Sequence, residues 1–344
     1  MVKPIFGWAV PTFGGINDTH IDTPLIDMID FKMIKEVAQL CEEEGYDKLW
    51  VADHFILGRS SRILEAWTVM SCLATLTHRV KIGSKVLCYA FRHPSILAKM
   101  VSTLDVISNG RVEIGLGAGW NEEEAKRYGI AFPAISTRIE QLEEYIIVLE
   151  KMLTESSPTF SGKYYTIEDA VCEPKPIQKP HPPLWIGTLR GGKKMFNLIA
   201  SYADGINTFG TLSSVKEKIE RIFESCKAIG RSVQNLKISC DTHVLIGRTD
   251  DEVREKKREI NKYNPNYPSY LYLSPDARQR HGIPDKMSWE EYEELYLIGR
   301  PDKIIKRLEE FIDIGVNEFV LWFLYLPHTD DIKLFSKEVM SSFI

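Results

Sequence analysis

An α/β fold of the (β/α)8 TIM-barrel class is predicted by three features of the sequence. Short apolar segments alternate with amphipathic helical stretches along almost the whole chain, which is the pattern of a parallel sheet with crossover helices. Eight such strand–helix units follow one another, and eight units can close a barrel whose site lies on the loops after the strand C-termini. No linker or change of composition divides the chain, so we expect one domain over 1–344. A doubly wound open sheet is the structural alternative.

The predicted elements follow from the hydrophobic pattern, which has a period near two in strands and near 3.6 in helices. In chain order, the predicted strands are 5–10, 47–52, 80–87, 111–116, 184–187, 205–209, 236–246 and 318–324. The predicted helical stretches are 28–44, 64–76, 94–107, a short one from 122, 136–153, 191–202 and 303–314. Gly45 follows the first helix and ends it, because glycine suits the left-handed residue that closes many helices.

Two segments interrupt the alternation. Residues 159–165 are predicted to form a hairpin that turns at Ser161-Gly162. Residues 261–298 are rich in Tyr, Pro and Asn and are too long for an ordinary barrel loop. Long insertions of this kind are often lids, and the aromatic residues favour a lid on the substrate side.

The composition excludes several classes of function. The chain has 344 residues, 44% of them hydrophobic and 26% charged, with a net charge of -5, so no basic surface for nucleic acid or anionic membrane is expected. No apolar run reaches the roughly 18 residues of a membrane span. The six cysteines are scattered, without C-x-x-C pairs or neighbouring histidines. This favours reduced thiols in the cytoplasm and no metal site.

The glycine-rich segment RVEIGLGAGWNEEE begins at Arg111. It contains the fourth predicted strand and continues to the start of the next predicted helix. A dinucleotide fingerprint would need a third glycine at position 120 or 122, and these positions hold Trp120 and Glu122. Three glutamates also stand at the start of the next helix, where a pyrophosphate would meet repulsion. The fingerprint is therefore excluded, and the glutamates 122–124 are interpreted as first-turn acids that the helix dipole favours.

Polar residues after two strands are the candidates for chemistry. Asp53-His54 ends the second strand, and an imidazole beside a carboxylate can act as a general acid or base. The alternative is that Asp53 caps the next segment and that His54 only packs. Cys88 follows the third strand, but no base is paired with it in the sequence, so a buried structural thiol is the preferred interpretation.

Two glycine-containing loops could hold a ligand. Gly117 to Asn121 admits the close approach of a flat ring, which Trp120 could stack against; a plain turn into a helix is the alternative. Thr188 to Gly192 opens a helix beside the cations Arg190, Lys193 and Lys194, an arrangement that suits a phosphate. A glycine turn with solvated lysines is the alternative there.

Several motifs, in order along the chain, resemble those of the bacterial-luciferase-like superfamily, and within it the coenzyme F420 (deazaflavin)-dependent oxidoreductases. The motifs are LWVADHF at 49–55, FRHP at 91–94, LDVISNGRVEIGLGAGW at 104–120, YGIAFP at 128–133, PKPIQKPHPPLWIG at 174–187 and YADGIN at 202–207. The resemblance implies a luciferase-like TIM barrel with insertions that holds an isoalloxazine-like ring at its C-terminal mouth.

The resemblance also implies roles for individual residues. Asp53 and His54 would meet the ring, and His54 would give or take the proton. Lys85-Val86 matches the end of the third strand, where relatives have a non-prolyl cis peptide bond. The expected cofactor-binding residues are Asp53, His54, Lys85, Val86, Gly117, Ala118, Gly119, Trp120, Asn121, Gly187, Thr188, Leu189, Arg190, Gly191 and Gly192, with phosphate at the loop 188–192. Trp120 stands where some F420-dependent dehydrogenases have a glutamate, and Lys85 replaces a small residue of some relatives.

The function implied is hydride transfer between coenzyme F420 and a small organic substrate. A reduced-FMN monooxygenase, resembling alkanesulfonate or luciferase enzymes, is the first alternative, and a barrel that binds cofactor without catalysis is the second. The partners expected are a small-molecule substrate and further copies of this chain, in a homodimer or a larger homo-oligomer.

Overall fold

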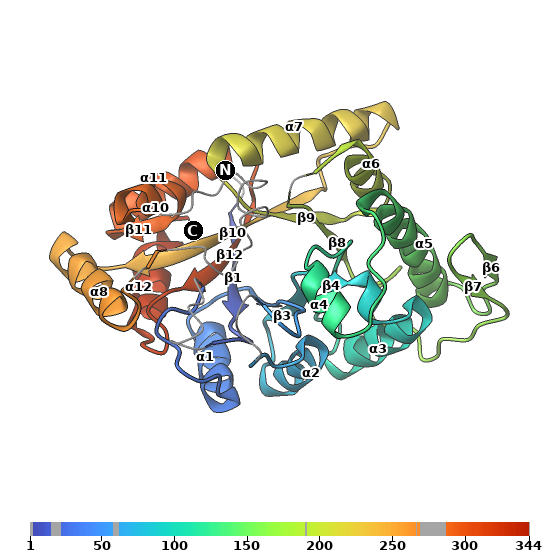
Figure 1. The fold of residues 1–344 in the computed structure, drawn as a ribbon, viewed down its shortest axis with the longest axis horizontal. Coiled ribbons are helices and arrows are strands. Elements are labelled where there is room, and N and C mark those ends of the chain that lie inside the picture. The colour runs from blue at the N-terminus through green and yellow to red at the C-terminus, as the bar shows by residue number, and fades with distance from the viewer. Residues whose placement is uncertain are drawn as a thin grey trace.

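Eight parallel strands close into a barrel in the computed structural model, and helices surround it (Figure 1). The structure describes residues 3–14, 22–57, 62–189, 191–265, 267–268 and 287–343. In barrel order the strands are β1 (Ile5–Val10), β2 (Lys48–Val51), β3 (Lys81–Ser84), β5 (Val112–Gly117), β8 (Leu184–Gly187), β9 (Gly205–Thr208), β10 (Lys237–Ile246) and β12 (Glu318–Phe323). Pairing of β12 with β1 closes the ring. The predicted TIM barrel is confirmed.

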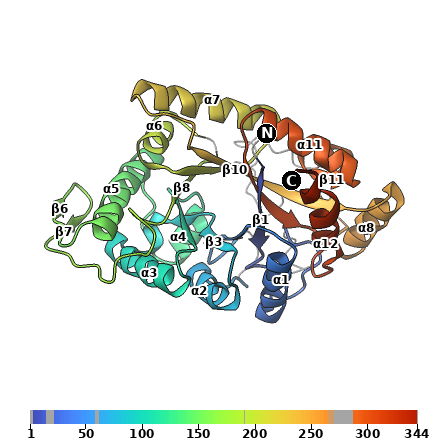
Figure 2. The ribbon, with the colours of Figure 1, turned by 180° about the vertical axis from the view of Figure 1, so that it is seen from behind.

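The helices lie outside the strands, with α1, α2 and α3 on one side of the barrel and α7 on the other in both views (Figures 1 and 2). Their bounds are α1 (Phe31–Glu43), α2 (Ala66–Leu76), α3 (Pro94–Ile107), α4 (Glu122–Arg127), α5 (Ile135–Thr154), α6 (Lys193–Tyr202), α7 (Leu212–Ala228), α8 (Asp250–Tyr263), α10 (Trp289–Leu295), α11 (Pro301–Asp313) and α12 (Asp330–Glu338), with short 3-10 turns η2 (Tyr89–Phe91) and η3 (Met340–Phe343). Local signals fix several starts: Asp30 caps α1 by accepting from the N–H of Lys32 at 2.9 Å, and proline, whose φ is already helical, begins α3. None of the helices described is both long and apolar enough to cross a membrane.

Three segments differ from the sequence prediction. The third strand is interrupted after Ser84, and only Leu87–Cys88 (β4) resumes pairing, with β5. The hairpin forms between β6 (Phe160–Ser161) and β7 (Thr166–Ile167), but its turn lies at 162–165, because the N–H of Gly162 donates to Tyr165. A short strand, β11 (Leu297–Gly299), pairs with β10 outside the ring, since an apolar run of three residues suffices to extend an exposed strand edge.

The segment 261–298 is divided among several elements. Residues 261–263 are the last turn of α8, and 289–295 form α10, which leads into β11. Residues 266 and 269–286 lie outside the described residues. The proposal that this segment closes over a substrate therefore stays a prediction.

Large aromatic side chains fill the middle of the barrel. Trp50 and Trp185 meet edge to face with their ring centroids 5.2 Å apart, and both are buried. Gly83 provides the space on the neighbouring strand β3, because a Cβ there would lie 2.3 Å from the Trp50 ring. Alternating very large and very small residues in this way lets the layers of a barrel interior interlock.

A buried ionic cluster closes the N-terminal end of the barrel. The Lys48 Nζ lies 2.8 Å from Glu113 Oε2 and 2.8 Å from Glu318 Oε2, and Trp185 Nε1 donates to Glu113 at 2.8 Å. These side chains come from different strands and fill the lumen below the tryptophans. Space for a ligand is therefore left at the C-terminal end, where the sequence places the candidate residues.

Candidate functional site

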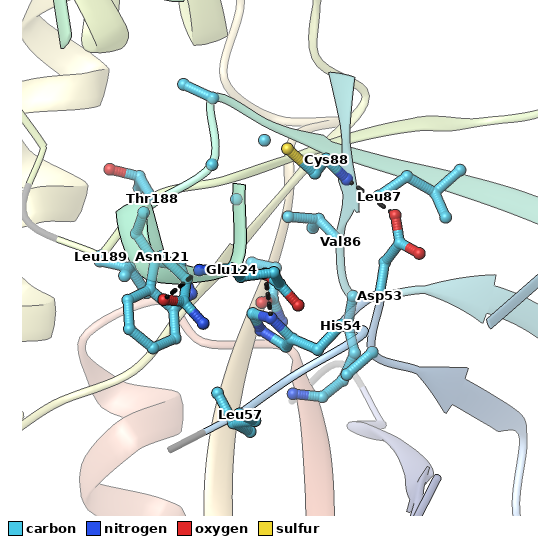
Figure 3. Close-up of a pocket in the computed structure, with 18 of the residues that line it drawn as sticks. Asp53, His54, Leu57, Val86, Leu87, Cys88, Asn121, Glu124, Thr188 and Leu189 are labelled. Atoms are coloured by element: carbon cyan, nitrogen blue, oxygen red, sulfur yellow. Dashed lines mark hydrogen bonds and ion pairs between the residues drawn. The ribbon is translucent and has the colours of Figure 1, made fainter. Parts of the chain in front are cut away.

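A pocket of about 550 Å³ opens at the C-terminal ends of the barrel strands (Figure 3). Thirteen of the predicted site residues line it: Asp53, His54, Lys85, Val86, Gly117, Ala118, Gly119, Trp120, Asn121, Gly187, Thr188, Leu189 and Gly191. Gly192 is described but does not line it, and Arg190 lies outside the described residues. No group of acidic, His and Cys side chains suited to a metal occurs in the described ranges.

The carboxylate partner of His54 is Glu124, from α4. Nδ1 of His54 lies 3.0 Å from Glu124 Oε2 (Figure 3), and Glu124 Oε1 accepts from the N–H groups of Phe55 and Ile56 at 2.5 and 3.0 Å. A carboxylate only accepts, so Nδ1 carries the proton and Nε2 is the basic nitrogen of the neutral ring. All three glutamates 122–124 lie in the first turn of α4, as predicted, but Glu124 is only 2% exposed and also holds His54, which the sequence did not indicate.

Asp53 is not the partner of His54, although it is its neighbour in sequence. Asp53 Oδ2 accepts from Arg92 Nη1 at 2.8 Å and Oδ1 accepts from Nη2 at 3.1 Å, and Oδ2 also accepts from the N–H of Cys88 at 3.0 Å. Successive residues of an extended chain point to opposite sides, so the two side chains reach different partners, His54 on α4 and Asp53 beside η2. The imidazole of His54 is therefore held by Glu124, and Asp53 holds Arg92 and the N–H of Cys88.

The interruption of the third strand forms the floor of the pocket. The Lys85-Val86 peptide bond is cis and non-prolyl, as the resemblance predicts. Glycines surround the Val86 side chain: a Cβ at Gly117 would lie 2.7 Å from it, and one at Gly187 would lie 2.8 Å away. Glycine at these positions therefore lets the floor lie close to two neighbouring strands.

The loop after β5 forms one side of the pocket. The carbonyl of Ala118 accepts from Arg138 Nε at 3.0 Å, and Asn121 caps α4 while its Nδ2 donates to Ile56 at 2.9 Å. The Trp120 ring is 38% exposed and meets the His54 ring edge-on, with the centroids 5.5 Å apart. These contacts hold the backbone beside His54 and leave an aromatic surface at the mouth.

The loop after β8 leads into α6. Thr188 is buried and its N–H donates to the Asn207 carbonyl at 2.9 Å. Gly191 and Gly192 both have positive φ, 73° and 149°. They lead into the N-terminus of α6, a ten-residue helix, where backbone N–H groups can bind an anion. Lys194 is paired with Glu140 at 2.9 Å, so its expected role as a cation for phosphate is not supported by its position.

The thiol of Cys88, which also lines the pocket, fits the structural role that the sequence predicts for it. Burial raises the pKa of Cys88 to about 12, so at neutral pH it is a poor nucleophile. A Cβ at Gly119 would lie 3.0 Å from its sulfur. Cys88 therefore packs beneath the glycine loop.

Sequence reasoning missed the side of the pocket formed by β10. Asp241 and His243 are alternate residues of this strand, so both point into the lumen, and both line the pocket with Asp22 and Trp322. The letters DTH, at the centre of a long apolar strand, are the signal that could have indicated them. Glu124 had a weaker signal, its position one helical turn beyond the capping Asn121.

Comparison with known proteins is consistent with this architecture. The family model of luciferase-like monooxygenases matches residues 6–318. An F420-dependent glucose-6-phosphate dehydrogenase of Amycolatopsis mediterranei (strain U-32) is 27% identical over 83% of this chain and 86% of its own. An FMNH(2)-dependent dimethylsulfone monooxygenase of Pseudomonas putida is 24% identical over 99% of this chain and 95% of its own.

A solved structure, of an F420-dependent secondary alcohol dehydrogenase in complex with an F420-acetone adduct, superposes with a TM-score of 0.77 at 22% identity, over 98% of each chain. The chain belongs to the luciferase-like monooxygenase family. It is an enzyme of the luciferase-like oxidoreductase class. Of the two relatives named above, one depends on the deazaflavin F420 and the other on reduced FMN.

Proposed function

We propose that this protein is a coenzyme F420-dependent oxidoreductase that transfers a hydride between the deazaflavin and a small organic substrate. The observation that supports this most directly is the His54–Glu124 pair at the mouth of the pocket. Hydride transfer to or from a carbon–oxygen or carbon–nitrogen bond needs one proton to move as well. The pair supplies one titratable nitrogen, held in one orientation, for that proton.

The residues present fit a flat tricyclic ring. The floor at Val86 is flanked by Gly117 and Gly187, where a Cβ would approach Val86 to within 2.8 Å and displace it, so the two glycines keep in place the floor on which a planar group would lie. The Trp120 ring stands beside His54 at the mouth. When bound, the cofactor would supply the two-electron chemistry.

The chain itself would perform three tasks. His54 Nε2 would hold or receive the proton, while Glu124 fixes the ring orientation through Nδ1. Val86 and the glycines 117 and 119 would bear the ring. The amide groups at Gly191 and Gly192 would face the phosphate at the start of α6, where N–H groups and the helix dipole favour an anion.

A reduced-FMN monooxygenase is the second candidate. It is supported by the Pseudomonas putida relative, which aligns over 99% of this chain. The same floor, loop and helix start would hold FMN, so the pocket geometry is compatible with both cofactors.

Equilibrium binding of F420 and FMN to the purified protein, followed by a substrate screen with the tighter ligand, tests the proposal. We expect F420 to bind more tightly and to exchange a hydride with at least one alcohol, carbonyl or amine substrate. FMN binding tenfold more tightly than F420, or oxygen consumption with reduced FMN, would favour the monooxygenase. Tight cofactor binding without turnover of any donor would indicate a binding protein.

A further inference from the structure

The side of the pocket formed by β10 contains a second set of charged residues, which the reaction above does not use. This β10 wall consists of Asp22, Lys85, Asp241, His243 and Trp322, all of which line the pocket. In barrel order β12, which carries Trp322, lies four strands from β5. Trp322 therefore faces the glycine loop across the lumen, on the far side of the space that a ring against that loop would occupy, and Lys85 reaches this side through its ion pair with Asp241.

The charges of the β10 wall are paired with one another. The Lys85 ammonium forms an ion pair with Asp241, and the two side chains are only 8% and 16% exposed. Asp241 also accepts from Asn207 Nδ2 at 2.9 Å. The same ammonium lies 4.8 Å from the centroid of the Trp322 ring. Lys85 is thus neutralised by a carboxylate and held over an aromatic face.

The second carboxylate of the wall is bound to an imidazole. Nε2 of His243 lies 2.6 Å from Asp22 Oδ1, and Nδ1 of His243 is hydrogen bonded to the Tyr292 hydroxyl. The Tyr292 hydroxyl in turn lies 2.9 Å from that of Tyr267. This network holds Asp22 and His243 against the interior.

Among the described residues of this half of the pocket, the cation that a negatively charged ligand could meet is Lys85, which already has Asp241 as its counter-ion. Among the described pocket residues the cationic side chains are Lys85 and Arg138. Arg138 donates to the carbonyls of Ala118 and Pro133, at 3.0 and 2.5 Å, on the side of the β5 loop. An anion placed against the wall would compete with Asp241 for Lys85 and would face the Asp241 carboxylate, and like charges at close range are disfavoured.

We propose that the β10 wall is the substrate half of the pocket, and that it accepts small organic molecules carrying no carboxylate, sulfonate or phosphate, namely neutral compounds and amines. Asp241 sets this preference by neutralising Lys85, and Trp322 provides the apolar face for the hydrocarbon body. The inference rests on the proposed function, because it assigns the opposite half of the pocket to the ring.

Three probes of equal size test the charge preference: cyclohexanol, cyclohexylamine and cyclohexanecarboxylate. Their dissociation constants are measured by calorimetry on the protein with its bound cofactor and again on the cofactor-free protein. We expect the wild type to bind the alcohol and the amine at least about tenfold more tightly than the carboxylate.

The charge variants should change that order in opposite directions. Asp241→Asn keeps the shape of the side chain but leaves Lys85 as an uncompensated cation, so the carboxylate should gain about tenfold relative to the alcohol. Lys85→Met leaves Asp241 without its ammonium, so the amine should gain instead. Asp251→Asn is the matched control, because it removes an exposed carboxylate paired with Arg254 on α8, outside the pocket.

Equal binding of all three probes to the wild type, no binding of any of them to the cofactor-bound protein, or an unchanged order in Asp241→Asn would overturn the inference. If the probes keep the expected order but neither F420 nor FMN binds, the proposed function fails while the charge preference stands.

Discussion

The Nδ1 atom of His54 and the Oε2 atom of Glu124 lie 3.0 Å apart, although the two residues are separated by 70 positions in sequence. The contact joins the end of β2 to the short helix after β5. Because Glu124 also accepts from two backbone N–H groups just after His54, it holds both the imidazole and the chain that bears it. This pair is the basis of the first two predictions.

Replacing His54 by alanine should leave cofactor affinity within a few-fold of the wild type and slow turnover by about 10²–10⁴, the usual contribution of a general acid or base. The expectation follows from the position of Nε2, the ring nitrogen not bound to Glu124. Steady-state kinetics and cofactor titration on the same preparation measure the two effects. Unchanged turnover would show that His54 only packs against Trp120.

Glu124→Gln should lower kcat by about 10²-fold with a smaller change in KM. The amide can present Nε2–H to the imidazole, which would force Nδ1 to accept and move the ring proton to the other nitrogen. Nitrogen-15 NMR of the imidazole reads this tautomer directly, without any activity measurement. Glu123→Gln is the control, because Glu123 is an exposed neighbour paired with Arg127; an equal loss in both variants would contradict the positioning role.

The barrel could be predicted from the sequence because its signal is spread over many residues. Each strand is a short apolar run, and the eight runs recur with helices between them, so an error of one or two residues at an end changes nothing in the topology. The break after Ser84 could not be predicted from the residues alone, since Lys85 and Val86 continue the strand pattern without a proline or glycine. Only the resemblance to a family indicated it.

The site was predictable where its residues follow the strands, and much less so where pairing depends on three-dimensional contacts. Asp53 and His54 are adjacent in sequence, yet the extended chain sends them to different partners, Arg92 and Glu124. Glu124 stands in a run of three glutamates, and only the geometry of a six-residue helix turns it inward. Composition and periodicity contain no information about such pairs.

Asp53→Asn should destabilise the protein, because it removes one partner of a buried ion pair. The Asp53 side chain is fully buried on Arg92, and breaking a pair of this kind costs about 3 kcal/mol. Urea denaturation at neutral pH measures the loss. Arg92 also bonds Glu65, so a loss well below 1 kcal/mol would mean that Glu65 compensates and that Asp53 is not needed to hold η2.

The cluster at the bottom of the barrel should make stability depend on pH. Burial and the nearby charge of Glu113 raise the pKa of Glu318 to about 7 from 4.5, against the opposing effect of Lys48. The folded state then binds a proton more tightly than the unfolded chain. The stabilisation is complete below pH 4.5 and is lost as pH rises to about 7, by about 3 kcal/mol.

Glu318→Gln removes this titration while keeping the shape of the side chain. The difference in free energy of unfolding between wild type and variant, measured from pH 5 to pH 8, should therefore move in favour of the variant as pH rises. If the difference stays nearly constant from pH 5 to pH 8 instead, Glu318 is already ionised in the folded state at pH 5 and its pair with Lys48 dominates.

The start of α6 should affect cofactors with a phosphate more than those without one. Gly191 has a φ of 73°, and a Cβ there would lie 2.1 Å from the Phe196 ring, so Gly191→Ala must shift the backbone N–H groups that open the helix. If these groups bind phosphate, affinity for FMN should fall by about tenfold or more, since a hydrogen bond to a charged group contributes about 1.5–3 kcal/mol. Riboflavin affinity should change little.

Gly230→Ala is the control for backbone strain, because Gly230 has a φ of 72° and nothing within 4 Å of the added Cβ. Equal losses for FMN and riboflavin in Gly191→Ala would place the phosphate elsewhere, and the glycines at 117 and 119 would then be the next positions to substitute.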